Sequence, residues 1–386
     1  MKHMADTTFR ERLPDYRNQY NRLKSKAAKG RFLDRIMAAF GYTRKFLIKR
    51  LSGNRPYGKR CGRGRTYGPG FEAMALELHR ASGWMCAPYL KVQMSRLVSD
   101  WEQLHGSMDP EVRKQLLQAG ESKFARLFRQ YPALHVRYGN RASGANGVKS
   151  SVTACPGKRI EDGRPGVMQL DSVAHGGGGE EPFFWSLDIV DAETQWVEFA
   201  FVWCRGAETT VEGFRKMAAR LPFPIRKLHP DGGGEFINST FLLHVERAMP
   251  GTEVFRSRPS RPNDNCRVEQ KNGSILRPWL RQWRLDDRSV QADLDWIAEK
   301  LALYVNLFVP SKKLLAKIPK EGKAVKYHYV YDTPKTPLER LHLAQPDNAN
   351  LERLDRNLRM TNGIALRRQI ERKISAVVRK TRKGAK

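Results

Sequence analysis

Apolar residues recur at helical spacing through the first third of the chain. This spacing predicts a helix, a turn at Gly41-Tyr42-Thr43 and a second helix within residues 30–51. Further helices are expected over residues 71–82, 89–101 and 111–129. The first pair has the form of a helix-turn-helix. The helices at 71–82 and 89–101 form a second candidate of the same kind, with a less basic second helix.

Between residues 166 and 280, short runs rich in branched and aromatic residues replace the helical spacing. Strands are expected over residues 167–173, 183–190, 195–203, 224–228 and 253–256, and helices over 209–221, 238–249 and from 264 onward. Three successive strands followed by alternating helices and strands favour a mixed five-stranded sheet flanked by helices.

The chain is therefore predicted to be multidomain, with α-helical modules before an α/β core. An amphipathic helix over residues 289–308, a strand over 325–331 and a helical end from 346 follow the sheet segment. The predicted parts are a basic helix-turn-helix module (1–58), a Gly/Arg linker with a second helical module (59–130), a linker (131–165), the core (166–310), and a basic C-terminal segment with a helical tail (311–386).

Charge adds a partner to this picture. The chain has 386 residues with 70 Lys and Arg against 40 Asp and Glu, a formal net charge of +30. Residues 1–70 alone hold 19 of the basic residues and 4 of the acidic ones. Such a field attracts polyanions, nucleic acid above all, although a ribosomal-type or membrane-surface protein could share it.

Basic residues in the first two parts are candidates for DNA contact. The second helix of the first module has the arrangement of a recognition helix in the major groove, and a Gly-Arg-Gly-Arg run can lie in a narrow minor groove. The alternatives are a helical hairpin with a solvated basic face and a flexible linker. The expected contacts are Arg44, Lys45, Lys49, Arg50, Arg63 and Arg65.

The cysteine pattern and the hydropathy indicate the cellular compartment in which the protein is expected. Five scattered cysteines without a C-x-x-C pair argue against a disulfide framework or a four-cysteine zinc site. The sequence contains no run of about 20 apolar residues, so no membrane span is expected. The N-terminal residues lack the apolar core of a signal peptide. A cytoplasmic protein associated with the chromosome is expected.

Three acids stand out in the core segment. Asp171 lies near the end of a predicted strand, Asp231 directly follows another, and Glu269 lies near the start of a helix. Carboxylates so placed could converge on divalent metal, because Mg²⁺ prefers oxygen ligands. Asp188 is a rival for Asp171, and Glu235 has the ordinary reading of a structural acid; any such acid taken alone is usually a solvated charge or a helix cap.

The surrounding residues carry a resemblance. His229-Pro230-Asp231-Gly232-Gly233-Gly234-Glu235-Phe236 and Pro262-Asn263-Asp264-Asn265-Cys266-Arg267-Val268-Glu269-Gln270-Lys271-Asn272 resemble the catalytic core of bacterial insertion-sequence DDE transposases, members of the retroviral-integrase superfamily. The resemblance implies an RNase H-like (integrase) core, with Asp171, Asp231 and Glu269 as its catalytic triad. It extends to Gly41-Tyr42-x-Arg44-Lys45 and Pro334-Lys335-Thr336-Pro337.

The sequence departs from the family at two places. Gly232 stands where Asn usually follows the second acid, and no paired His/Cys zinc motif is seen near the N-terminus. The first departure keeps open a catalytically inactive, transposase-derived DNA-binding regulator. A nuclease of the same fold, which cuts but does not join, is a third reading.

What the resemblance implies is DNA transposition by a DDE-type polynucleotidyl transferase. Two Mg²⁺ (or Mn²⁺) ions would be held per active site, with Asp171 bridging both, Asp231 holding one and Glu269 the other. The expected partners are double-stranded element ends and target DNA, with at least a dimer on DNA, no membrane and no nucleotide cofactor. Near the acids, Arg256, Arg258, Arg261 and Lys271 would neutralise phosphates, unless they form an ordinary solvated basic loop.

The charged residues of the C-terminal tail are almost all basic. From Arg367 to Lys386 nine Lys or Arg residues accompany one acid, Glu371. A tail of this kind either binds the DNA backbone or lacks fixed structure.

Overall fold

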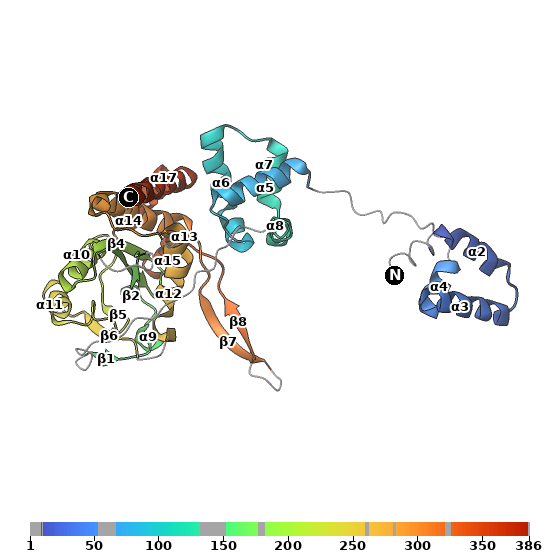
Figure 1. The fold of residues 1–386 in the computed structure, drawn as a ribbon, viewed down its shortest axis with the longest axis horizontal. Helices are drawn as coiled ribbons and strands as arrows, with labels where there is room; N and C mark the ends of the chain where they lie inside the picture. The colour runs from blue at the N-terminus through green and yellow to red at the C-terminus, as the bar shows by residue number, and fades with distance from the viewer. Residues whose placement is uncertain are drawn as a thin grey trace. The chain divides into compact units, whose positions relative to one another are not determined.

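A computed structural model describes residues 9, 11–52, 67–131, 152–176, 182–258, 262–280, 283–320 and 326–384 (Figure 1). Contacts divide the chain into two compact units, Met1–Gly68 and Pro69–Lys386. No described helix is both long enough and apolar enough to cross a membrane.

The first unit is a small helical module. Its helices are α2 (Leu13–Arg22), α3 (Lys26–Phe40) and α4 (Arg44–Leu51). Ser25 and Thr43 cap α3 and α4 by accepting hydrogen bonds from backbone N–H groups of the first turn, as short hydroxyl side chains do. Gly41 ends α3 with φ +69°, a left-handed conformation that glycine adopts without strain. The predicted helix, turn and helix are confirmed.

The second unit begins with four helices, labelled in Figure 1. They are α5 (Pro69–Ala81), α6 (Ala87–His105), α7 (Pro110–Gln118) and α8 (Glu121–Phe128). The single helix predicted over 111–129 is wrong. Ala119 and Gly120 have extended backbone angles between α7 and α8, because glycine is a poor helix former and the apolar periodicity alone does not register the break.

A six-stranded mixed sheet forms the centre of the second unit. Its strands are β1 (Thr153–Ala154), β2 (Val167–Ala174), β3 (Phe184–Asp191), β4 (Val197–Trp203), β5 (Lys227–Pro230) and β6 (Glu253–Arg256). The spatial order is β1-β6-β5-β2-β3-β4. The β2–β3 and β3–β4 pairs are antiparallel, whereas β2–β5, β5–β6 and β6–β1 are parallel.

The sheet has one strand more than the five predicted. The additional strand, β1, pairs with β6 and lies within residues 131–165, which were assigned to a linker from their glycine, proline and basic content. A short helix, α9 (Gly157–Ile160), follows it in the same stretch. Two strand residues are too few to produce a recognisable alternation, and residues 132–151 lie outside the described residues.

Helices pack onto this sheet. α10 (Ala207–Ala218) and α14 (Gln291–Phe308) contact β4, and α12 (Cys266–Lys271) contacts β2 and β3. α11 (Ser239–Ala248) packs against α10. Gly213 allows the close approach of α10, since a Cβ there would lie 2.7 Å from side-chain atoms of Leu187 and Val202.

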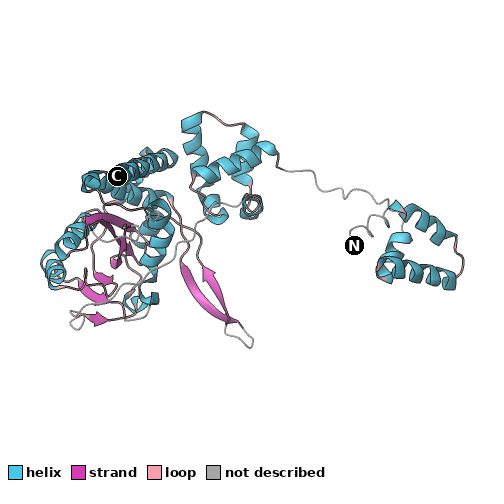
Figure 2. Cartoon of the chain, in the orientation of Figure 1, coloured by secondary structure: helices cyan, strands magenta, loops and turns pink. Residues whose placement is uncertain are grey.

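The chain after the sheet is mostly helical. A π-helical turn (Asn272–Leu276) and α13 (Arg277–Leu280) continue α12. After α14 come a two-stranded antiparallel ribbon, β7 (Leu314–Lys320) with β8 (Lys326–Tyr331), and the helices α15 (Pro337–Ala344), α16 (Leu351–Met360) and α17 (Gly363–Gly384). Figure 2 shows the ribbon apart from the main sheet. The helical end predicted from residue 346 is confirmed.

Candidate functional site

Strand pairing brings Asp171 and Asp231 together. β2 and β5 run parallel, with Leu170 opposite Pro230, so the next residue on each strand is one of the two acids. The Asp231 backbone N–H donates to the Leu170 carbonyl at 3.3 Å. The first two predicted acids therefore lie side by side, Asp171 within β2 and Asp231 directly after β5.

Glu269 comes from α12, and buried polar side chains join that helix to β2. Gln169 Oε1 accepts from the backbone N–H groups of Arg267 at 3.0 Å and Val268 at 3.4 Å, so a side chain of β2 caps the helix. Asn265 Nδ2 donates to the Leu170 carbonyl at 2.8 Å. These bonds hold the first turns of α12, and with them Glu269, against the strand that contains Asp171.

Mutual repulsion shows that the three acids face one region. The pKa of Asp171 is raised to about 7, first by burial and then by the charges of Asp231 and Glu269. The pKa of Glu269 is also raised, by burial and by Asp231, while Arg277 opposes the shift. The described residues nevertheless contain no three His, Cys, Asp or Glu side chains already gathered to hold one metal ion. The acids are close enough to interact but are not a preformed cage.

A fourth carboxyl lies behind the three. Asp188 is opposite Asp171 in the β2–β3 register and is fully buried. Neither of its carboxyl oxygens has a hydrogen-bond partner of good geometry among the described residues, although the Asn272 amide is near enough to oppose the rise in its pKa caused by burial and by Asp171. Asp171, the residue chosen over Asp188 from the sequence, is the more accessible of the two and is adjacent to Asp231.

Two further side chains position Asp171 and its neighbour. Asn272, buried at the start of the π-helical turn, donates from Nδ2 to Asp171 Oδ2 at 2.7 Å. Ser172 donates from Oγ to Glu235 Oε1 at 2.6 Å. The structural reading of Glu235 fits this bond and its ion pair with Arg205 at 3.4 Å. The sequence patterns gave no role to Asn272 or to Gln169.

The residues present fit a divalent cation. Asp171, Asp231 and Glu269 offer hard oxygen donors, and a cation would relieve the repulsion that raises the pKa of Asp171. Gly233 leaves the space around Asp231 open, because a Cβ there would come within 2.8 Å of Asp231 Oδ1. The Gly233 N–H donates to that oxygen at 2.9 Å and orients the carboxylate.

Three other polar residues of the sheet and its strand ends have structural contacts. Asp191 accepts three hydrogen bonds in the β3–β4 turn, from the Glu193 and Thr194 N–H groups and the Thr194 hydroxyl, as expected of a hairpin-turn residue. His175 is buried against Ser186 at 3.0 Å, and His229 is bonded to the Cys155 carbonyl at 2.9 Å.

The predicted DNA contacts of the first unit lie on α4. Arg44, Lys45 and Lys49 are exposed, and the Arg50 guanidinium lies 5.3 Å from the centre of the Phe46 ring. Arg44 forms an ion pair with Asp34, so part of its charge is already compensated. Arg63 and Arg65 lie outside the described residues, as does Arg261 of the second unit.

The other predicted contacts near the acids are partly committed to the protein. Arg256 donates to the Val152 carbonyl at 2.9 Å and thereby joins β6 to the residue before β1. Arg258 forms an ion pair with Asp264 at 2.8 Å. Lys271 is only 7% exposed, and burial lowers its pKa to about 8. Its side chain is therefore directed into the protein in this conformation.

Comparison with known proteins identifies a relative but assigns no activity. No protein-family model matches the chain. A curated protein of Sinorhizobium fredii, named only as the uncharacterized protein y4rM, is 31% identical over 328 residues. The match covers 83% of this chain and 91% of that protein, and at this length it must include residues 171–269, which contain the three acids.

Proposed function

The chain belongs to the same family as the uncharacterized y4rM protein, and because that name assigns no activity, we propose from the site itself that the protein is a DDE-type DNA transposase. It would bind the ends of a mobile element, cleave DNA to expose 3′-hydroxyl groups, and join these to target DNA by transesterification. No ATP is required, since transesterification conserves the phosphodiester bond.

The observation that carries the proposal is the meeting of three acids from separate elements. Asp171 lies on β2, Asp231 directly after β5 and Glu269 on α12; Asp231 and Glu269 add to the rise that burial causes in the pKa of Asp171, and Asp231 adds to the rise in that of Glu269. Ionisable groups whose pKa is raised both by burial and by neighbouring like charges are common in functional sites. Such an arrangement is typical of a site that awaits cations.

The chain order supports an RNase H-like core. β2, β3 and β4 follow one another as antiparallel strands, and β5 and β6 then alternate with α10, α11 and α12. This is the β-β-β-α-β-α-β-α order expected of that fold, with β1 as an added edge strand. In this reading the acids lie where the family places its catalytic residues.

Each residue of the site has a distinct task in the proposed reaction. Asp171, Asp231 and Glu269 would hold two divalent ions. When bound, these ions supply the charge that activates the attacking hydroxyl and stabilises the leaving 3′-oxygen. Asn272 fixes one oxygen of Asp171, so that its carboxylate keeps one orientation. Gln169 holds the helix of Glu269 at a set distance from β2.

DNA would be delivered by the basic helical modules. The exposed Lys45 and Lys49 on α4 and the overall charge of +30 suit a polyanionic partner. Because transposition joins two ends, at least two copies would act together on DNA. The alternative, an inactive DNA-binding regulator, is favoured by Gly232, which replaces the usual Asn beside Asp231.

The test is strand joining of labelled duplexes, taken as fragments from the DNA that flanks the gene, to a plasmid in Mg²⁺ or Mn²⁺. Wild type is compared with Asp171→Asn, Asp231→Asn and Glu269→Gln, and with Glu246→Gln, an exposed acid of α11, as the matched control. Joining by wild type and the control alone, with DNA binding kept in all, is the expected result.

Two other outcomes would redirect the assignment. Binding without cleavage of any flanking fragment by wild type would favour the inactive regulator. Cleavage without joining would favour a nuclease with the same metal site.

A further inference from the structure

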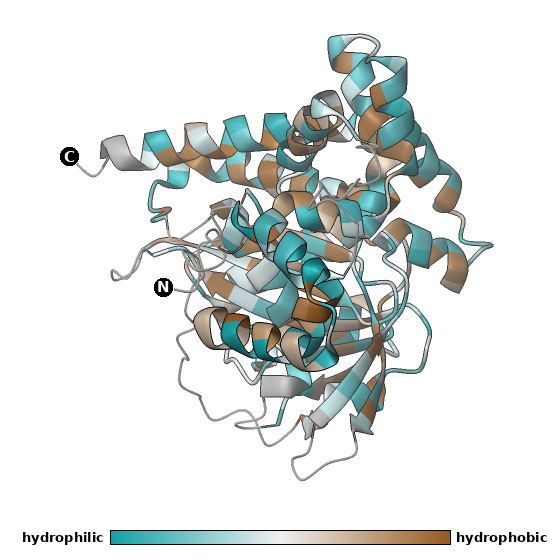
Figure 3. Ribbon diagram, turned by 90° about the vertical axis from the view of Figure 1, so that its right-hand side faces the viewer, coloured by the Kyte–Doolittle hydropathy of each residue, from teal (hydrophilic) through white to brown (hydrophobic). Residues whose placement is uncertain are grey.

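One face of α17 is buried in the core of the second unit. Its residues Leu366, Ile370, Ile374, Val377 and Val378 belong to the main hydrophobic cluster, and the helix packs along α14. Figure 3 shows apolar and polar bands alternating along this helix. The tail is thus an amphipathic helix as far as Gly384, and its basic residues from Arg367 to Lys380 can be assigned to one face or another.

The basic residues nearest the core already have acidic or aromatic partners. Lys373 and Lys380 both form ion pairs with Asp293 of α14, at 2.6 and 2.8 Å. Arg367 forms an ion pair with Glu371 at 2.7 Å and lies 4.4 Å from the Trp279 ring centre. These cations fasten α17 to the protein.

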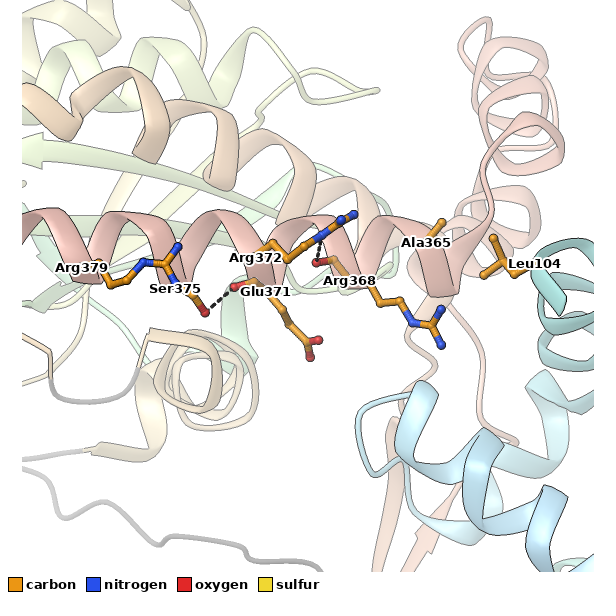
Figure 4. A pocket seen from close by; sticks show the side chains of 7 residues that line it. All are labelled: Leu104, Ala365, Arg368, Glu371, Arg372, Ser375 and Arg379. Carbon is orange, nitrogen blue, oxygen red and sulfur yellow. Dashed lines mark hydrogen bonds between the residues drawn. The ribbon is translucent and has the colours of Figure 1, made fainter.

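Three arginines on the outer face differ. Arg368, Arg372 and Arg379 are exposed, and none forms an ion pair within the described part of the chain. They are four and seven residues apart, so they follow one side of the helix over about 16 Å at 1.5 Å per residue. Figure 4 shows all three side chains along the outer side of α17.

A groove runs beside these arginines. It has a volume of about 730 Å³ and is lined by Leu104 of α6 together with Ala365, Ser375, Glu371 and the three arginines. The Glu371 carboxylate is compensated by Arg367, and the Ser375 hydroxyl donates to the Glu371 carbonyl. The net charge of the groove is therefore positive.

We propose that the Arg368–Arg372–Arg379 face of α17 binds the backbone of double-stranded DNA without sequence preference. Duplex DNA carries one phosphate charge per about 1.7 Å of its axis, so roughly nine phosphates pass along the length of the arginine row. Guanidinium donors match the geometry of phosphate oxygens. The choice of DNA as the polyanion rests on the proposed function; the cationic row itself does not.

The test is the salt dependence of duplex binding by the full chain, in EDTA, with a labelled duplex of arbitrary sequence. The variant Arg368→Gln/Arg372→Gln/Arg379→Gln removes three phosphate contacts. The slope of log K against log salt concentration should then become shallower by about 2.7, at about 0.9 per contact. Equal melting temperatures would establish that α17 remains folded.

The matched control removes three exposed arginines from the neighbouring helix α16, as Arg353→Gln/Arg356→Gln/Arg359→Gln. The control should keep the wild-type slope. An equal loss in both variants would overturn the proposal in favour of a simple net-charge effect, and an unchanged slope in the α17 variant would overturn it outright. Loss of binding to double-stranded RNA, with DNA binding kept, would also contradict it.

Because the measurement contains no divalent ion, it does not depend on catalysis. A wild type that binds duplex with the predicted slope but never joins strands would leave this inference standing and refute the proposed function. The converse result, joining with an unaffected slope in the α17 variant, would refute only the inference.

Discussion

Gln169→Met should loosen the helix that carries Glu269 while leaving the strand that carries Asp171 in place. Methionine has nearly the volume of glutamine, so the change removes hydrogen bonds without opening a large cavity. Gln169 is 2% exposed, and its amide serves two N–H groups of α12 and the Asp264 carbonyl, at 3.0, 3.4 and 3.4 Å.

The expected cost follows from those bonds. A hydrogen bond contributes about 0.5–1.5 kcal/mol net, and a buried donor left without a partner costs about 1–3 kcal/mol. Two of the three bonds are long and therefore weak, so the free energy of unfolding should fall by about 2–3 kcal/mol. A shift of Glu269 by about 1 Å should reduce strand joining by roughly 10²-fold.

Urea denaturation followed by tryptophan fluorescence measures the first effect in the relevant unit, because all eight tryptophans lie between Trp84 and Trp296. Gln270→Met is the control, on the same helix but exposed. If Gln169→Met matches the control in both stability and strand joining, the reasoning that Gln169 couples β2 to α12 is refuted.

Three other changes probe the same unit. Burial lowers the pKa of His175 to about 4, so between about pH 6.5 and 4 the unfolded chain binds a proton that the folded chain does not. As pH falls over this range, the free energy of unfolding of the wild type should drop by about 3 kcal/mol more than that of His175→Gln. Equal pH profiles in urea titrations would contradict this. Gly157→Ala would place a Cβ 2.2 Å from the Asp264 carbonyl oxygen, so we expect the free energy of unfolding to fall by about 1–3 kcal/mol. A melting temperature equal to that of wild type would show that the contact is not tight. Asp162 has a pKa well below its usual range because Arg226 donates to both its oxygens at 2.7 Å. Asp162→Asn should lower stability by about 1 kcal/mol at neutral pH, and the difference should shrink gradually as pH falls below about 4; a difference independent of pH would refute the assignment.

Long periodic elements were predictable from the sequence. The helix, turn and helix around Gly41 are found where the apolar spacing places them, and the amphipathic helix expected over residues 289–308 corresponds to α14. Their signals are local, because each depends on the residues inside the element itself.

Short and interrupted elements were not predictable in this way. β1 has two residues and exists because β6 pairs with it, which no pattern within residues 131–165 could indicate. The break at Gly120 lies within an unbroken apolar period, so α7 and α8 were merged. In both cases the deciding partner or backbone angle lies outside the hydrophobic pattern.

In the candidate site, too, local sequence signals were predictable and contacts across the fold were not. The three acids were identified from their sequence contexts, and the structure brings them within electrostatic reach. Asn272 was not identified as the partner of Asp171, because the two residues are 101 positions apart. Gln169 was missed for the same reason, since its bonds reach across the fold to α12.

The most direct measurement of the metal site is calorimetric titration of the full chain with Mn²⁺. The account predicts saturable binding of two ions per chain in wild type and in Glu246→Gln, with both lost in Asp171→Asn because that carboxylate is expected to bridge them. Binding that is the same in wild type and Asp171→Asn, or no saturable binding in wild type, would contradict the claim that Asp171, Asp231 and Glu269 form a two-metal site.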